Sequence, residues 1–262
     1  GWGDMRILVV NDDGINAKGI RTLAARLAQD HEVTVVAPMT EQSATSHSVT
    51  LNRPLRVTQV SPEGLGGIDC YMIDGSPVDC TKIGLSHVTK GEVDLIVSGI
   101  NHGHNLGSDM LYSGTVAAAL DAVIMGFKAL AVSVTSYTPK HFDAVAETAA
   151  RLIDSGLFDG PPCGMLYNLN VPDLPLEQIK GVKATRQGKT VYEDAIEVRE
   201  DPKGKKYFWI AGRLKENTDI DDTDVSQVNQ GYASLTPVKY DITAFEEIEN
   251  LSCKIEKLKL HN

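Results

Sequence analysis

Two adjacent carboxylates, Asp12 and Asp13, follow a short apolar run and precede Gly14. In a site of low dielectric constant these carboxylates would repel each other, and a divalent cation would relieve that repulsion. Mg²⁺ and Mn²⁺ prefer oxygen ligands such as carboxylates, amide carbonyls and hydroxyls. Ser43 and Asn101 lie in two further polar segments and carry oxygens of this kind. These four residues are therefore candidate ligands of a divalent metal ion.

The three polar segments follow predicted strands or lie in the loops beyond them. Ligands of open parallel sheets bind beyond the carboxyl ends of the strands, so we expect the segments to converge on one edge of the sheet. A simpler interpretation is that Asp12 and Asp13 only cap a helix that begins near Ile15 and form a turn with Gly14. The three parallel polar segments favour the metal site over that interpretation.

A second candidate is an anion site at the start of the helix predicted over 113–125. Segment 103–107 is rich in Gly and Asn, which allow tight turns, and Ser113-Gly114-Thr115 begins the helix. Free backbone N–H groups and the positive end of the helix dipole favour an anion there. The hydroxyls of Ser113 and Thr115 can donate to phosphate oxygens. A capped helix without a ligand is the alternative, and the Gly-rich approach to the helix favours phosphate.

The histidines near these segments have no unique interpretation. His102 and His104 flank the Gly-rich loop, and His47 lies near Ser43. Each could be a general acid or a metal ligand, and an ordinary hydrogen-bonded loop histidine is the simpler interpretation. No GxGxxG follows Val10, and neither a GxxxxGK[ST] phosphate loop nor a GxSxG nucleophile elbow is present. A nicotinamide-dependent oxidoreductase is therefore disfavoured.

The elements that must position these residues alternate between strands and helices. Short apolar runs predict buried strands at 6–10, 32–37, 70–73, 94–98, 129–135 and 165–171. Segments between them predict helices over 17–29, 76–88, 113–125 and 142–153. Repeated βαβ units give parallel sheets with right-handed crossovers. The sequence therefore predicts a doubly wound α/β fold with a mostly parallel sheet.

The character of the chain changes after residue 172, where alternating and acidic segments replace the apolar runs. We expect a single domain over 5–262, with an α/β core over 5–172 and a C-terminal extension over 173–262. The extension is expected to contain a β-hairpin over 180–212 and a helical tail over 245–260. The extension lacks an obvious compact core. We therefore expect it to pack on the domain or on another subunit. Gly1 to Asp4 are expected to be a remnant of expression before a native Met5.

Composition limits the partners. The net charge of −10 argues against duplex nucleic acid, because a polyanion binder needs clustered Lys and Arg. No apolar run approaches the roughly 20 residues of a transmembrane helix, so no membrane partner is expected. The cysteines at 70, 80, 163 and 253 have neither zinc-binding nor CxxC spacing. Buried free thiols in a reducing compartment are the favoured interpretation, and we expect the cytoplasm.

Four segments together resemble the SurE (survival protein E) family of nucleotide phosphatases. They are NDDGINAKGI, EQSATSHSVT, SGINHGHNLGSDMLYSGTVAAAL and TDVSQVNQGYASLTPVKYDIT, and the similarity runs from Met5 to about Thr243. The resemblance implies a Rossmann-like core and hydrolysis of nucleoside 5′- and 3′-monophosphates, with short polyphosphate as a further substrate of some members. It also implies homodimers or homotetramers formed partly by exchange of C-terminal segments.

The resemblance also implies residue roles. One divalent metal ion per subunit, Mg²⁺ or Mn²⁺, would be bound by Asp12, Asp13, Ser43 and Asn101. The phosphate would be bound by Asn105, Ser113, Gly114 and Thr115. Asp12, Asp13 and Asn105 would be catalytic. The family commonly has Gly where this chain has Ala44, and Glu-Gly where it has Asp121-Ala122. Neither difference affects an expected ligand.

The expected reaction is attack of a metal-activated water on the phosphoryl group. Asp12 or Asp13 would orient that water or accept its proton, and a covalent aspartyl-phosphate route is the rival mechanism. The alternative function is a non-catalytic nucleotide-binding or regulatory protein on the same fold. The intact set of acidic and amide ligands disfavours that alternative.

Overall fold

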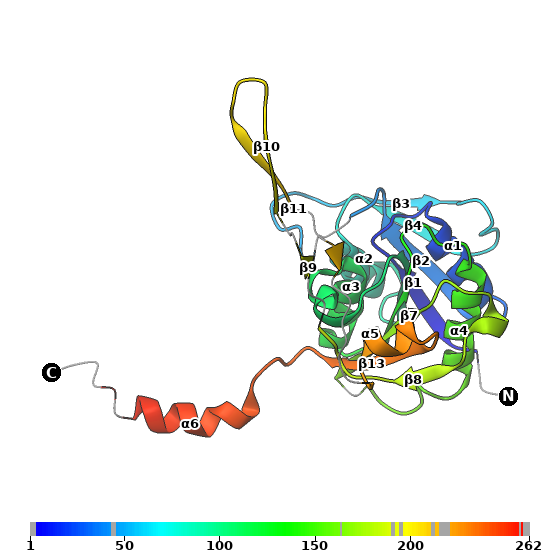
Figure 1. The fold of residues 1–262 in the computed structure, drawn as a ribbon. Coiled ribbons are helices and arrows are strands. Elements are labelled where there is room, and N and C mark those ends of the chain that lie inside the picture. Colours follow the sequence, from blue (N-terminus) through cyan, green and yellow to red (C-terminus); the bar gives the residue numbers. More distant parts are fainter. Residues whose placement is uncertain are drawn as a thin grey trace.

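The computed structural model describes residues 4–42, 46–162, 164–189, 192–193, 196–210, 213–214, 221–256 and 258. Its centre is a nine-stranded sheet with the strand order β3-β4-β2-β1-β5-β6-β7-β13-β8, flanked by helices (Figure 1). The strands of this sheet are β1 (Arg6–Val10), β2 (Glu32–Pro38), β3 (Val57–Val60), β4 (Asp69–Ile73), β5 (Leu95–His102), β6 (Ala129–Val134), β7 (Met165–Val171), β8 (Val182–Ala184) and β13 (Ala233–Lys239). The helices are α1 (Lys18–Leu27), α2 (Pro77–Ile83), α3 (Gly114–Ile124), α4 (Phe142–Asp154), α5 (Asp224–Asn229) and α6 (Phe245–Ile255).

The central strands are parallel, which confirms the predicted fold class. β1 pairs in parallel with β2 and β5, and the parallel pairing continues from β2 to β4 and from β5 through β6 to β7. β3 pairs with β4 in antiparallel fashion at one edge of the sheet. β5 is longer than the expected strand and is irregular between Ser98 and Asn101. This irregularity lies where the polar site segment begins.

Both faces of the sheet are covered by helices. Successive residues of a strand point to opposite faces, so a strand that is apolar at successive positions must be buried on both sides. Ile7 and Val9 of β1 belong to the hydrophobic core shared with α1 and α4. Leu8 and Val10 belong to the second core, shared with α2 and α3. All four residues are at most 2% exposed, which explains why residues 7–10 of the strand are all apolar rather than alternating with polar residues. The molecule is thus a three-layer α/β/α structure.

The start of α2 agrees with the sequence in detail. Ser76 is the N-cap, and it forms a reciprocal capping box with Asp79 while Pro77 occupies the first turn. The α-helix ends at Ile83 and continues as a π-helix over Gly84–Val88, so the helical segment reaches the expected residue. On the opposite face, α1 approaches β5 closely: a Cβ at Gly19 would lie 2.1 Å from the carbonyl oxygen of Ile100.

The sheet extends beyond the core expected over 5–172. β13 pairs with β7 in antiparallel fashion, and the three-residue strand β8 pairs with β13 in parallel. Part of the C-terminal region is therefore integral to the sheet rather than an addition to it. The hairpin expected over 180–212 has its described strands between residues 192 and 214. β10 (Ile196–Glu200) pairs with β11 (Lys206–Ile210), and β9 (Tyr192–Glu193) pairs with β12 (Arg213–Leu214) in the same antiparallel register.

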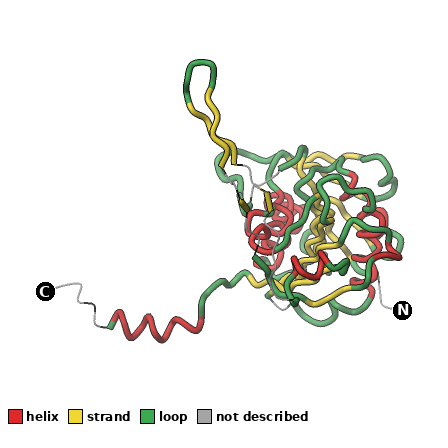
Figure 2. Tube along the Cα trace, viewed as in Figure 1, coloured by secondary structure: helices red, strands yellow, loops and turns green. Residues whose placement is uncertain are grey.

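Two arms leave the body of the molecule. The β10–β11 hairpin and helix α6 project from it at separate points (Figures 1 and 2). Both arms expose large apolar side chains: Ile196, Val198, Phe208, Trp209 and Ile210 on the hairpin, and Phe245, Ile248, Leu251 and Ile255 on α6. Exposed apolar surface of this extent marks a site of interaction. Exchange of these arms between subunits stays a prediction. Within the described part of the chain, no helix is long and apolar enough to cross a membrane.

Candidate metal and phosphate site

A cavity of about 420 Å³ opens at the carboxyl ends of β1 and β5, beside the start of α3. Six of the expected metal-binding and phosphate-binding residues line it: Asp12, Asp13, Asn101, Asn105, Ser113 and Gly114. His102 and His104, whose roles the sequence left open, line it as well. Thr115 is fully buried and touches Asp12. Ser43 lies outside the described residues. The expected convergence of the strand-end segments therefore holds for the first and third of them, and the second segment reaches the same place through Glu41.

The turn after β1 is held by its own asparagine. The Asn11 side-chain amide donates to the Gly14 carbonyl (2.9 Å), and the Gly14 N–H donates to Asn11 Oδ1 (3.2 Å). Gly14 has a φ of +95°, a conformation that glycine adopts without strain. The Gln42 N–H donates to the carbonyl of Asp12 (2.7 Å). The turn that carries both carboxylates is thereby joined to the loop that leads to Ser43.

Asp12 is a buried carboxylate with few compensating contacts. It is 6% exposed, and its Oδ1 accepts a hydrogen bond from Thr115 Oγ1 at 2.6 Å. Burial, together with the neighbouring charge of Asp13, raises the pKa of Asp12 to about 6, although the hydrogen bonds from Thr115 act in the opposite direction. A cation in the cavity would remove most of this penalty.

Asp13 is paired with His102. Asp13 Oδ1 lies 2.8 Å from His102 Nδ1, and Oδ2 accepts the His102 backbone N–H at 3.2 Å. Burial raises the pKa of Asp13, and the contacts with His102 oppose this. Burial lowers the pKa of His102, but its hydrogen bond with Asp13 and the charges of Asp13, Glu41 and Asp12 outweigh this effect and raise it. The contact therefore holds the Asp13 carboxyl and the His102 ring together beside the cavity.

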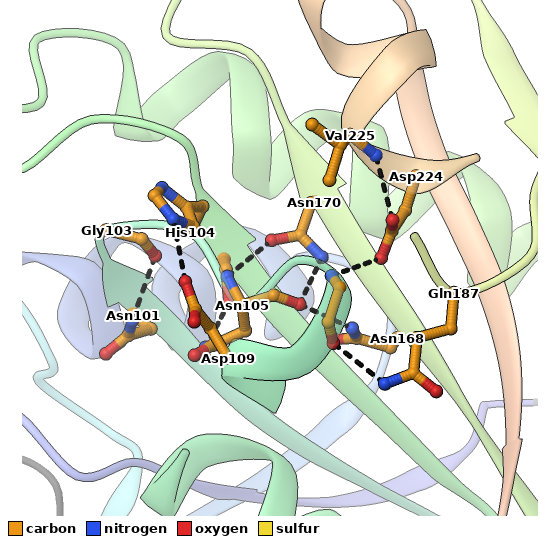
Figure 3. A network of polar contacts seen from close by, with 12 residues as sticks. Asn101, Gly103, His104, Asn105, Asp109, Asn168, Asn170, Gln187, Asp224 and Val225 are labelled. Atoms are coloured by element: carbon orange, nitrogen blue, oxygen red, sulfur yellow. Dashed lines mark hydrogen bonds and ion pairs between the residues drawn. The ribbon is translucent and has the colours of Figure 1, made fainter. Parts of the chain in front are cut away.

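The donor set of the cavity suits a hard divalent cation. Asp13, Glu41 and His102 each offer one ligand atom, and these atoms lie within 4.8 Å of one another. The Asn101 amide nitrogen donates to the Gly103 carbonyl at 2.9 Å (Figure 3), and no described group donates to its Oδ1. Carboxylate and amide oxygens are preferred ligands of Mg²⁺ and Mn²⁺. Glu41 was absent from the expected ligand set, and the role of His102 was left open. Their only sequence signal is their proximity to Ser43 and Asn101.

The start of α3 combines a cap with a place for an anion. Ser113 is the N-cap residue, and its Oγ accepts the Val116 N–H at 3.1 Å. Its hydroxyl proton is still available to an acceptor in the cavity. Because α3 has 11 residues, its dipole adds to the positive potential at this end. The Thr115 hydroxyl instead donates to Asp12, so here it stabilises a carboxylate; its expected contact with phosphate stays a prediction.

Asn105 is held by a buried amide network (Figure 3). Its backbone N–H donates to Asn170 Oδ1 (2.8 Å), and its carbonyl accepts from the side-chain amides of Asn168 (2.8 Å) and Asn170 (3.2 Å). Its own side-chain amide donates to Ser133 Oγ at 2.8 Å. These contacts fix Asn105 rigidly at the wall of the cavity. Since Asn168 and Asn170 are on β7 and Ser133 is on β6, two neighbouring strands determine its position.

Asp224 anchors the same loop from the C-terminal part of the chain. Its carboxylate is fully buried and accepts three backbone N–H groups at 2.8 Å, from Gly107, Gly188 and Val225. The Gln187 side chain also reaches the loop and donates to the Gly107 carbonyl at 3.0 Å (Figure 3). Gly107 begins the 3₁₀ helix Gly107–Tyr112, which leads directly to Ser113. The role of Asp224 was not expected, because two of its three partners, Gly107 and Gly188, are distant in sequence.

Asp121 of α3 joins α3 to α2 and to the segment after Ser43. Its side chain is 3% exposed and lies 2.9 Å from Lys82 Nζ and 3.3 Å from His47 Nε2. Burial acts to raise the pKa of Asp121, but the hydrogen bonds and charges of His47 and Lys82 outweigh it and lower the pKa. His47 is thus an ion-pair partner that holds segment 46–50 to α2 and α3.

Comparison with known proteins identifies the family of the chain. The family model described as "Survival protein SurE" matches residues 7–194. The chain belongs to the SurE family. The proteins named "5′-nucleotidase SurE" of Aeromonas hydrophila and Symbiobacterium thermophilum are 42% and 44% identical to it, over 96% and 94% of this chain and 99% and 96% of their own lengths. The crystal structure of the SurE protein from Aquifex aeolicus superposes with a TM-score of 0.85 at 34% identity, covering 95% of this chain and 99% of that one.

Similarity to these SurE proteins extends past the matched family segment. It covers nearly the whole chain, so it includes β13 and also α5, whose first residue is Asp224. The α/β fold with a mostly parallel sheet is therefore shared with a solved SurE structure. The roles of individual residues in this chain rest on the geometry above.

Proposed function

We propose that the chain is a divalent-metal-dependent phosphatase that hydrolyses nucleoside 5′- and 3′-monophosphates to nucleoside and phosphate. One observation carries the proposal: two acidic side chains, one of them almost fully buried, line the same cavity as the capped start of α3. Such a cavity offers ligands for a cation and donors for an anion side by side. The names of the relatives, 5′-nucleotidase SurE, support the substrate class. Short polyphosphate is proposed as a further substrate.

Asp12, Asp13 and Asn101 would hold one Mg²⁺ or Mn²⁺ per subunit, together with Ser43 on the evidence of the sequence. When bound, the ion would polarise the phosphoryl group and lower the pKa of a ligated water. The start of α3 and the Ser113 hydroxyl would bind the phosphoryl oxygens and stabilise the negative charge that develops on them. Asn105, fixed by its amide network, would position the phosphate. His102 holds the Asp13 carboxylate in one orientation.

The first test is phosphate release from a panel of 5′- and 3′-monophosphates with Mg²⁺, Mn²⁺ or chelator. We expect metal-dependent release that Asp13→Asn abolishes. Asp159→Asn is the matched control, because this exposed carboxylate follows α4 and so lies near the opposite edge of the sheet. Nucleotide binding without release by folded protein would favour the non-catalytic alternative. A trapped phospho-aspartate would replace direct attack by water with the covalent route.

We also propose that the subunits assemble into a homodimer or homotetramer through the two arms. The exposed apolar residues of the β10–β11 hairpin and α6 support this. Light scattering of the full chain should give a multiple of the subunit mass, and a monodisperse monomer would contradict the proposal. Location in the cytoplasm likewise stays a proposal, and the free, buried thiols of Cys70 and Cys80 are compatible with it.

A further inference from the structure

One wall of the cavity is aromatic and has no part in binding metal or phosphate. Tyr112 and Tyr137 both line the cavity, and they are 67% and 68% exposed. Exposed tyrosines are common on protein surfaces and need no explanation by themselves. The support beneath one of these rings is specific, however, and it links that ring to the site.

Tyr137 is braced by the loop that follows Asn101. Its ring meets the His104 ring edge-on, with 5.7 Å between centroids and 63° between planes. His104 is in turn fixed by Asp109, whose Oδ2 lies 3.1 Å from His104 Nε2 (Figure 3). A Cβ at Gly103 would lie 2.7 Å from Cε1 of Tyr137, so the ring packs directly against this glycine. Gly103 has a φ of +98°, which other residues rarely adopt.

The same glycine is attached to both neighbouring segments. Its N–H donates to the Ser136 carbonyl (2.8 Å), one residue before Tyr137, and its carbonyl accepts the Asn101 amide (2.9 Å). The position of the ring is therefore coupled to that of an expected metal ligand. One side of the Tyr137 ring is supported, and much of its surface remains open to the cavity and to solvent.

We propose that Tyr137 is the platform on which the base of the substrate nucleotide stacks. The inference rests on the proposed function. With the phosphate at Ser113, the ribose extends along the cavity and the base must meet another part of its wall. An aromatic ring suits this contact, because every base presents a π-face. A stacking platform accepts purines and pyrimidines alike and favours purines for their larger face, so the enzyme binds nucleotides without reading the edge of the base.

The test compares a nucleotide with the same ester lacking its base. Adenosine 5′-monophosphate and ribose 5-phosphate are assayed with wild type, Tyr137→Ala, Tyr137→Phe and Tyr240→Ala. Tyr240 is a matched control, since it is an exposed tyrosine (49%) just after β13 and is not among the residues lining the cavity. The readout is the ratio of kcat/KM for the nucleotide to kcat/KM for ribose 5-phosphate.

Tyr137→Ala should lower this ratio by about 5- to 100-fold, mainly through KM for the nucleotide, because stacking on one ring is lost. Tyr137→Phe keeps the π-face and should restore the wild-type ratio, as should Tyr240→Ala. An unchanged ratio in Tyr137→Ala would overturn the proposal, and so would an equal loss with both esters, which indicates a structural role only.

Failure of the proposed function is a distinct result. If wild type hydrolyses neither ester, binding of adenosine 5′-monophosphate is measured by calorimetry with the same variants. Weaker binding to Tyr137→Ala, but not to Tyr137→Phe, would still support the platform. Equal affinities of all the variants would reject it.

Discussion

Replacing Asp224 by asparagine should destabilise the fold and loosen the phosphate-site loop. The carboxylate is fully buried and accepts three N–H groups: Oδ1 those of Gly188 and Val225, and Oδ2 that of Gly107. Asparagine can keep one oxygen facing two of these donors, but its NH₂ then faces the third donor. Hydrogen bonds to a charged group contribute about 1.5–3 kcal/mol each. We therefore expect Asp224→Asn to lower the free energy of unfolding by about 2–3 kcal/mol.

The control is Asp222→Asn, two residues away. Asp222 accepts from a cation instead of from buried N–H groups: it forms an ion pair with Arg186 at 2.7 Å, and its side chain is 63% exposed. An exposed pair contributes about 0–1 kcal/mol, so this variant should be nearly neutral. Urea unfolding of both variants gives the comparison, and phosphate release by the folded proteins reports the state of the loop. Equal stabilities of Asp224→Asn and Asp222→Asn, within about 0.5 kcal/mol, would refute the anchoring role.

Three further outcomes follow from contacts described above. Asp12→Asn should stabilise the metal-free protein at pH 8 by something on the order of 3 kcal/mol, because folding raises the pKa of Asp12 from 3.8 to about 6 and the ionised carboxylate therefore destabilises the fold above that interval. Thermal unfolding in chelator at pH 4 and pH 8 checks this, and an unaltered pH dependence of the variant would contradict it. Asp121→Asn should destabilise the protein by about 2 kcal/mol at neutral pH, since the pKa of Asp121 is lowered by His47 and Lys82 against the effect of burial. The loss should shrink as the pH falls from 3.8 through the lowered pKa of the folded protein, because the wild-type carboxyl is then protonated first in the unfolded and afterwards in the folded state; a constant difference down to pH 3 would speak against these contacts. Gly19→Ala should lower the free energy of unfolding by about 2 kcal/mol, because the new Cβ would lie 2.1 Å from the Ile100 carbonyl oxygen. The control Gly66→Ala, whose Cβ would have nothing within 4 Å, should leave it almost unchanged, and similar unfolding midpoints for both variants would show that α1 shifts freely.

Local signals in the sequence predicted the elements that depend on local interactions. β1 has the expected residues because an apolar run that is buried on both faces is visible without its partners. The start of α2 was visible because Ser76 and Pro77 are adjacent to the groups they cap. By contrast, β8 has three exposed residues and is a strand only because β13 lies beside it. Pairing between distant segments leaves no local pattern, so the extent of the sheet was underestimated.

The site shows the same distinction. Asp12 and Asp13 follow β1, and Asn101 lies at the end of β5, so their convergence at the carboxyl ends of the strands followed from the fold class. Asp224 could not be recognised, since an acidic residue in the first turn of a helix is ordinary in itself and its partners lie 36 and 117 positions away. Glu41 was missed because its closeness to Asp13 and His102 arises from the path of a loop.

The position of Asp224 also bears on when activity can appear during synthesis of the chain. Asp12, Asp13, Asn101 and Ser113 are all translated in the first half, and the parallel strands that carry them can pair early. The clamp on Gly107 must wait for residue 224, together with β13, which completes the sheet beside β7. A nascent chain, or a fragment cut within the β10–β11 hairpin, would contain the acidic residues of the site but lack this clamp. Catalytic competence would then be the last property acquired, after the ribosome has finished most of the polypeptide.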